Sequence, residues 1–186
     1  MSLSGDSFDI QDHFGVLRYR IKGKFLSLRE RKTLSDASGN LLYQMRDSLP
    51  TLHGRQLISN AAGAPVVVIR QKSFIPLMGG TSEIKIWRGS EENGKPWLSC
   101  KAKGGRNNFI ITEVATRRRF CFVERDRLNF DNIVWGKDTY VANVLPGTDA
   151  ALMIMVVVAI DEIYHEGHSS FHKVGKLAIK QTILNM

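Results

Sequence analysis

The chain has 186 residues, 43% of them hydrophobic and 24% charged, which is typical of one soluble globular domain and excludes a disordered chain. Lysine and arginine number 26 against 18 aspartate and glutamate residues, so the net charge of +8 favours anionic partners: lipid headgroups, nucleic acid or acidic proteins. The first residues lack a basic region followed by an apolar stretch, so we expect no secretory signal and a cytoplasmic protein.

Short segments with the character of β-strands follow one another along most of the chain. Residues 18–22 alternate basic and apolar side chains, which is the period of a strand with one solvated face. Further strands are expected at residues 25–34, 41–45, 66–69, 83–87, 97–103, 108–114, 119–124, 128–135 and 139–144. Gly, Asn and Asp between them predict tight turns, so we expect an antiparallel meander that follows a flexible N-terminus at residues 1–13.

One internal repeat is visible. Residues 34–39 read LSDASG and residues 58–63 read ISNAAG. An Asp or Asn three positions before a Gly satisfies the backbone of a turn, so the repeat predicts a recurring strand–turn–strand unit. It concerns architecture alone.

The pattern changes after Thr148. Asp149 can cap a helix, and residues 150–160 are apolar on every face, so we expect a central helix near residues 149–164. The run is shorter than the roughly 20 residues that a bilayer span needs, so the helix must be buried in protein. In a chain made otherwise of strands, that place is the inside of a closed or nearly closed barrel. Residues 173–184 are expected to form a last strand or a short helix.

Several stretches together resemble the plant LURP-one-related family, which belongs with the tubby C-terminal and phospholipid-scramblase-like folds. Residues 28–32 precede residues 36–40, which are similar to the family's D-x-x-G-N turn, and residues 52–55 are similar to its L-H-x-R segment. Residues 136–138, Pro146, Asp149, the apolar run and residues 161–163 then follow in the family's order. The resemblance spans residues 25–166.

The resemblance implies a closed antiparallel β-barrel of about 12 strands around one hydrophobic helix, which agrees with the periodicity. It implies a single tubby-like domain over residues 14–186. Plant relatives are associated with pathogen defence, tubby domains bind phosphoinositides through surface basic residues, and scramblase-like members are membrane-associated. The resemblance supplies no catalytic residues.

Two groups of basic residues are the candidate binding sites. Arg18, Arg20, Lys22 and Lys24 share one face of a strand, about 6.6 Å apart, and could span neighbouring phosphates. The alternative is a solvated edge strand protected by its charges. A second group could gather if its strands pair through the intervening hairpins, or could be a scattered solvated face: Lys101, Lys103, Arg106, Arg117 and Arg119.

Metal binding and catalysis have weaker support. His165, His168 and His172 lie near two glutamates, but only the Glu162–His165 spacing suits a helical ligand pair, so no metal site is expected. The two cysteines sit among apolar neighbours, where a free thiol acts as a small hydrophobe. Acidic residues are disfavoured near a helix C-terminus, so Asp161 and Glu162 are expected to meet a cation or backbone donors. We expect neither a cofactor nor an enzyme.

These observations favour a non-catalytic peripheral module that binds anionic phospholipid headgroups, above all phosphoinositides, at the plasma membrane. The apolar loop at residues 74–80 either enters the headgroup region or folds over a barrel end. The alternative function is a protein-interaction or regulatory scaffold, related to defence or stress, that contacts an acidic protein or, with less support, nucleic acid.

Overall fold

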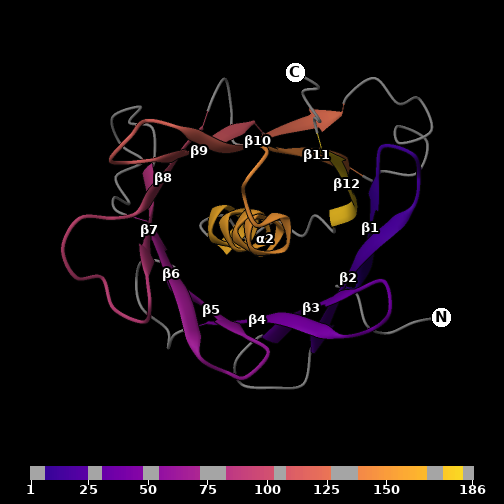
Figure 1. Ribbon diagram of the computed structural model, residues 1–186, viewed down its shortest axis with the longest axis horizontal. Helices are drawn as coiled ribbons and strands as arrows, with labels where there is room; N and C mark the ends of the chain where they lie inside the picture. The colour runs from indigo at the N-terminus through magenta and orange to yellow at the C-terminus, as the bar shows by residue number, and fades with distance from the viewer. Residues whose placement is uncertain are drawn as a thin grey trace.

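A computed structural model describes residues 7–24, 31–47, 55–71, 83–102, 108–126, 138–166 and 174–181. Within these ranges twelve strands surround one helix, α2 (Figure 1). The elements are β1 (Phe8–Asp12), β2 (Leu17–Lys24), β3 (Arg31–Asp36), β4 (Leu41–Asp47), β5 (Arg55–Asn60), β6 (Pro65–Gln71), β7 (Glu83–Arg88), β8 (Leu98–Ala102), β9 (Phe109–Glu113), β10 (Arg119–Asp126), β11 (Asp138–Val144), α2 (Ala150–Glu166) and β12 (Val174–Gln181).

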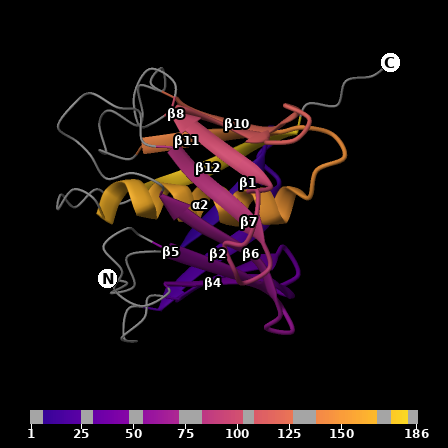
Figure 2. The same ribbon diagram turned by 90° about the vertical axis from the view of Figure 1, so that its left-hand side faces the viewer.

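The strands pair in chain order. From β1 to β11 each strand is antiparallel to the next, whereas β12 lies between β11 and β1 and is parallel to both. The mainly β class and the central helix are confirmed. Antiparallel pairing throughout is wrong at β12, because α2 crosses back through the ring of strands and brings the chain to the end where β11 begins (Figure 2).

Strand β1 lies within the N-terminal segment that the sequence predicts to be flexible. Its Ile10 is fully buried, and the strand pairs with both β2 and β12. The prediction of a flexible N-terminus is therefore wrong for Phe8–Asp12. Strand β5 was expected only as the strand that the repeat places before the turn at residues 60–63, and β12 decides for a strand between the two options for the last segment. The expected strand at residues 128–135 lies outside the described residues.

The core forms between α2 and the inward side chains of the strands. Alternate strand residues such as Ile21, Leu34 and Ile58 are fully buried, and so are Ile154 and Met155 of the helix. Because strands surround the helix, every one of its faces can be covered, which explains a sequence without a polar face. In the described part of the chain, no helix has the length and apolar character that a membrane crossing requires.

Asp149 caps α2, as the sequence predicts. Its Oδ1 accepts a hydrogen bond of 3.0 Å from the Leu152 backbone N–H, and its Oδ2 accepts one of 2.6 Å from the Tyr43 hydroxyl. Burial and the Asp149 carboxylate together raise the pKa of Tyr43, so the hydroxyl keeps its proton and remains a donor. The cap thus ties the start of the helix to β4.

Replacing Asp149 by alanine should lower the free energy of unfolding by about 1 to 2 kcal/mol, because the Leu152 N–H and the Tyr43 hydroxyl both lose their acceptor. Asp149→Asn keeps an acceptor oxygen and should cost less. Urea denaturation followed by circular dichroism measures both variants. Equal midpoints for the alanine variant and the parent protein would contradict this role.

The repeated turn is confirmed, and the structure adds a third copy. Asp36 and Asn60 each accept a backbone hydrogen bond through a side-chain oxygen, from Asn40 at 2.8 Å and from Ala64 at 2.9 Å. In the third copy, Asp12 Oδ1 accepts a hydrogen bond of 3.0 Å from the Val16 backbone N–H. In all three turns the fourth residue is a Gly with positive φ, a conformation that side chains disfavour: Gly15, Gly39 and Gly63.

Candidate functional site

Strand β2 carries the first predicted basic group on its outer face. Arg18, Arg20 and Lys22 are exposed, whereas Ile21 is fully buried and Tyr19 packs against the core. The predicted alternation is therefore confirmed for these residues. Lys24 occupies the next alternate position of the strand, and its side chain lies outside the described residues.

Two of these cations already have carboxylate partners on β1. Arg18 Nε lies 2.9 Å from Asp12 Oδ2, and Arg20 Nε lies 2.8 Å from Asp9 Oδ1. Burial raises the pKa of Asp12, but hydrogen bonds from the Val16 N–H and from Arg18 outweigh it and hold that pKa below its usual value. Asp12 therefore stays ionised at neutral pH, and the charge of Arg18 is largely offset within the protein.

The strand register brings other cations beside Lys22. Lys24 lies directly opposite Arg31 on β3, and Arg31 lies directly opposite Arg46 on β4. Lys22, Arg31 and Arg46 are exposed, and none of them forms an ion pair with a carboxylate among the side chains that the structure describes, which do not include that of Asp47. We call these four residues, Lys22, Lys24, Arg31 and Arg46, the outer basic patch.

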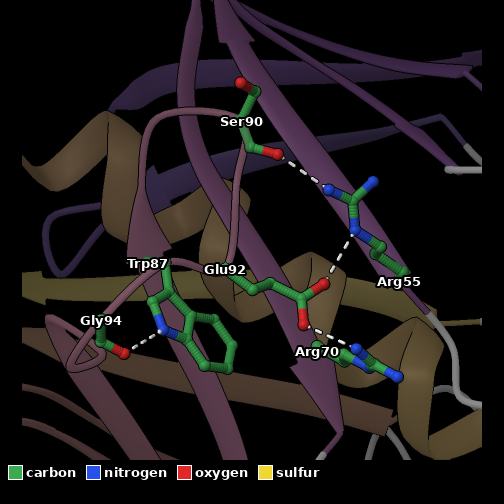
Figure 3. A network of polar contacts seen from close by, with 6 residues as sticks. All are labelled: Arg55, Arg70, Trp87, Ser90, Glu92 and Gly94. Atoms are coloured by element: carbon green, nitrogen blue, oxygen red, sulfur yellow. Dashed lines mark hydrogen bonds and ion pairs between the residues drawn. The ribbon is translucent and has the colours of Figure 1, made fainter.

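Like charges directly opposite each other destabilise a sheet. The same sheet holds a second cross-strand row, in which Arg55 lies opposite Arg70 and Arg70 opposite Lys85. There the carboxylate oxygens of Glu92 lie 2.9 Å from Arg55 Nε and 2.7 Å from Arg70 Nη1 (Figure 3). Glu83 Oε1 lies 2.7 Å from Lys85 Nζ. Carboxylates thus offset the repulsion in this row, and Figure 3 shows the part of it that Glu92 bridges.

The Glu92 contact belongs to a small second core that the sequence analysis missed. Leu57, Val68 and Trp87 form an apolar cluster on the outer side of β5, β6 and β7, and Val68 is fully buried. The loop after β7 is bonded to this side, because Arg55 donates to the Ser90 carbonyl at 2.8 Å. The uninterrupted apolar run in β6 could have predicted this second core, because such a run is typical of a strand buried on both faces.

Two arginines also shape the ionisation of Glu92. Its burial raises the pKa, but the hydrogen bonds and charges of Arg70 and Arg55 outweigh that effect and lower the pKa of Glu92. The carboxylate is therefore charged at neutral pH and keeps both guanidinium groups occupied. This row is a structural network, whereas Arg31 and Arg46 of the outer basic patch form no ion pair among the side chains that the structure describes.

The second predicted basic group is spread out. Strands β8, β9 and β10 do pair in sequence, but Lys101 shares a register position with Ile110, whereas Arg119 lies opposite Thr112, two positions along. Arg117 lies in the turn before β10 with a φ of 66°. These three residues are exposed but do not form a cross-strand row. Lys103 and Arg106 lie outside the described residues.

The acidic end of α2 meets a cation, as expected. Lys32, which faces inward from β3, forms an ion pair with Glu162, and the two side chains are only 13% and 14% exposed. No other sequence-predicted acidic or nucleophilic residue gathers into a reactive site within the described part. Both cysteines are buried, and burial raises the pKa of the Cys121 thiol to about 12, so that thiol is protonated and unreactive at neutral pH.

A metal site was not expected, and among the described residues no group of three or more metal-binding side chains occurs. The side chain of His165, and the whole of His168 and His172, lie outside the described residues. The apolar loop at residues 74–80 lies outside them as well.

Comparison with known proteins identifies relatives in Arabidopsis thaliana. The chain is 28% identical to Protein LURP-one-related 5 over 87% of this chain and 78% of that protein, and 21% identical to Protein LURP-one-related 15 over 91% and 79%. An X-ray structure of an Arabidopsis thaliana protein matches 73% of this chain and 85% of its own, with 17% identity and a TM-score of 0.37. A family model described as LURP-one-related matches residues 1–161. The chain therefore belongs to the LURP-one-related family.

Proposed function

We propose that this protein is a non-catalytic peripheral membrane module that binds the phosphates of anionic lipid headgroups, phosphoinositides above all, through the outer basic patch. One observation carries the proposal: Arg31 and Arg46 face each other across two strands with no described carboxylate to offset them. An anionic ligand would relieve this repulsion, in the way that Glu92 relieves it between Arg55 and Arg70.

The spacing of the outer basic patch suits phosphate groups. Neighbouring strands lie about 4.8 Å apart, so the three residues Lys24, Arg31 and Arg46 span about 10 Å of the barrel surface. Arginine offers several N–H donors in a planar fork that matches phosphate oxygens. The patch could therefore contact one phosphorylated headgroup at several points, or two neighbouring lipids.

Electrostatic attraction would bring the protein to the surface. The net charge of +8 attracts it to the anionic cytoplasmic leaflet, and such attraction falls steeply with salt. In this proposal Lys101, Arg117 and Arg119 add to the attraction at long range, while Arg18 and Arg20 contribute less because their charges are offset by Asp12 and Asp9. The corresponding location is cytoplasmic, at the plasma membrane.

The family resemblance supports the proposal that the lipids bound are phosphoinositides. We place the barrel with the tubby C-terminal and phospholipid-scramblase-like folds, in which a strand barrel surrounds a hydrophobic helix. In tubby domains surface basic residues bind phosphoinositides, although no residue of this chain can be aligned with theirs. A lipid-binding role for an outer basic surface is therefore consistent with that grouping.

Co-sedimentation with vesicles tests the proposal. Vesicles of phosphatidylcholine alone should leave the protein in solution, and added phosphatidylinositol phosphates should bind it. Binding should weaken by about tenfold or more between low and physiological salt, since released counterions and screening both act on the exposed cations. Equal binding to neutral and anionic vesicles, or binding to neither, would contradict the proposal. Salt-dependent binding to nucleic acid without lipid binding would favour the scaffold function instead.

A further inference from the structure

Three large apolar side chains are exposed in the described part of the chain, and all lie near the same edge of β2 to β4. Phe14 is 77% exposed, Val16 is 51% exposed and Leu41 is 38% exposed. Phe14 and Val16 belong to the turn between β1 and β2, and Leu41 begins β4. Single exposed hydrophobes are common, so these three are significant only because of how they are held and what lies beside them.

The turn itself does not require an aromatic residue. The two other copies of the same turn carry Ser38 and Ala62 at the position of Phe14. At the position of Val16 they carry Asn40 and Ala64. Because the hydrogen bonds of the turn come from the Asp or Asn and the backbone, small or polar residues serve equally well there. The two apolar residues in the first copy therefore need a reason other than folding.

The turn also holds Phe14 firmly in its exposed place. Asp12 Oδ1 accepts hydrogen bonds from the backbone N–H groups of Phe14 and Val16, at 2.9 and 3.0 Å. The other carboxylate oxygen of Asp12 is paired with Arg18. Gly15 supplies the positive φ of 79° that closes the turn. The aromatic ring is thus presented on an ordered support.

The apolar residues share a face with the outer basic patch. Val16 precedes Arg18, Arg20 and Lys22 at the same alternate spacing, so it points to the outer side of β2. Leu41 lies opposite Ser35, which in turn lies opposite Arg20. Strand β2 extends about 26 Å for its eight residues, so exposed apolar groups occupy one end of this face. The other end carries cations that no described carboxylate offsets.

We propose that this face lies against an anionic bilayer, with Phe14, Val16 and Leu41 inserted among the lipid headgroups and the outer basic patch on the phosphates. The inference rests on the proposed lipid-binding function and adds an apolar anchor and an orientation to it. Peripheral proteins bind most firmly when apolar burial and electrostatic attraction act together. The charge of the face selects a bilayer with anionic lipids as the occupant of this apolar edge.

The direct test replaces the anchor by the alanines that the Asn60 turn carries at the same positions. The variant Phe14→Ala/Val16→Ala removes apolar area without changing the charge, and both positions are exposed, so the fold should remain. Its affinity for vesicles with phosphatidylinositol phosphates should fall about tenfold, while its salt dependence stays that of the parent protein. A circular dichroism spectrum and urea midpoint equal to those of the parent protein establish that the variant is folded.

A second measurement reports the position of the turn in the membrane. In a Phe14→Trp variant, added anionic vesicles should shift the extra fluorescence to shorter wavelength, and brominated acyl chains should quench it. The matched control is Ala115→Trp, on the exposed turn between β9 and β10, which should show neither change.

The outcomes separate the two proposals. Vesicle binding that depends on anionic lipid but is unchanged in Phe14→Ala/Val16→Ala, with no shift for Phe14→Trp, would overturn the anchor and leave the lipid-binding function standing. Absence of binding to every vesicle, for the parent protein, would overturn both. If the anchor binds a protein partner and not a bilayer, vesicle binding should likewise be unchanged in Phe14→Ala/Val16→Ala, and Phe14→Trp should show no shift.

Discussion

Replacing Ile154 by alanine should lower the free energy of unfolding by about 2 to 5 kcal/mol, because this side chain is fully buried at the centre of the barrel. The helix α2 is surrounded by strands and packs into the same cluster as Ile21, Leu34 and Ile58. A shortened side chain there removes apolar contacts and leaves a cavity that the surrounding strands cannot easily close.

The matched control is Ile154→Val, which removes a single methylene and should cost about 0.5 to 1.5 kcal/mol. Urea denaturation of the three proteins, followed by tryptophan fluorescence, measures the difference. If α2 left the barrel to insert in a membrane, its side chains would add nothing to the stability of the protein in solution. Equal urea midpoints for the alanine variant and the parent protein would therefore contradict the central place of the helix.

The second large effect is expected at the ion pair inside the barrel. Replacing Lys32 by methionine should lower the free energy of unfolding by about 3 kcal/mol, because it leaves the Glu162 carboxylate largely buried without its cation. The negative end of the helix makes an uncompensated carboxylate there still less favourable. The estimate lies at the lower end for a buried pair, since both side chains keep some contact with solvent.

A double-mutant cycle distinguishes this charge effect from lost packing. The variant Lys32→Met/Glu162→Leu removes both charges and should recover much of the stability that Lys32→Met loses, giving a coupling energy of about 1 to 3 kcal/mol. Urea denaturation at neutral pH measures all four proteins. Additive losses, with no recovery in the double variant, would show that Lys32 and Glu162 act independently.

Local sequence patterns predicted the parts of the fold that depend on neighbouring residues. The alternation in β2 indicated which cations are exposed, the apolar run with Asp149 indicated a capped central helix, and the acidic end of that helix indicated a cation beside Glu162. Each of these follows from one segment and its period. The repeat likewise predicted two turns of the same kind, although the first copy at Asp12 was missed because its apolar residues disguise it.

The remaining features depend on which strands become neighbours. Opposition of Arg31 and Arg46 follows from a pairing register that shifts at an irregularity between Leu34 and Ser35, which no local pattern shows. Glu162 pairs with Lys32, and Glu92 bridges Arg55 and Arg70. These partners are distant from each other in sequence, so local patterns could not identify them. Parallel pairing of β12 depends on the path of α2 through the barrel.

The most direct test of the lipid-binding proposal compares two variants that lose the same charge. Arg31→Gln/Arg46→Gln removes two cations of the outer basic patch, and Lys101→Gln/Arg119→Gln removes two exposed cations that lie outside it and do not form a cross-strand row. Affinity for vesicles with phosphatidylinositol phosphates should fall about thirtyfold for the first variant, at about 1 kcal/mol for each basic residue on the lipid. It should fall no more than about threefold for the second, whose cations act on the membrane only at long range, where salt screens them. Equal losses for the two variants would show that only the overall charge matters, and would contradict a lipid site at the outer basic patch.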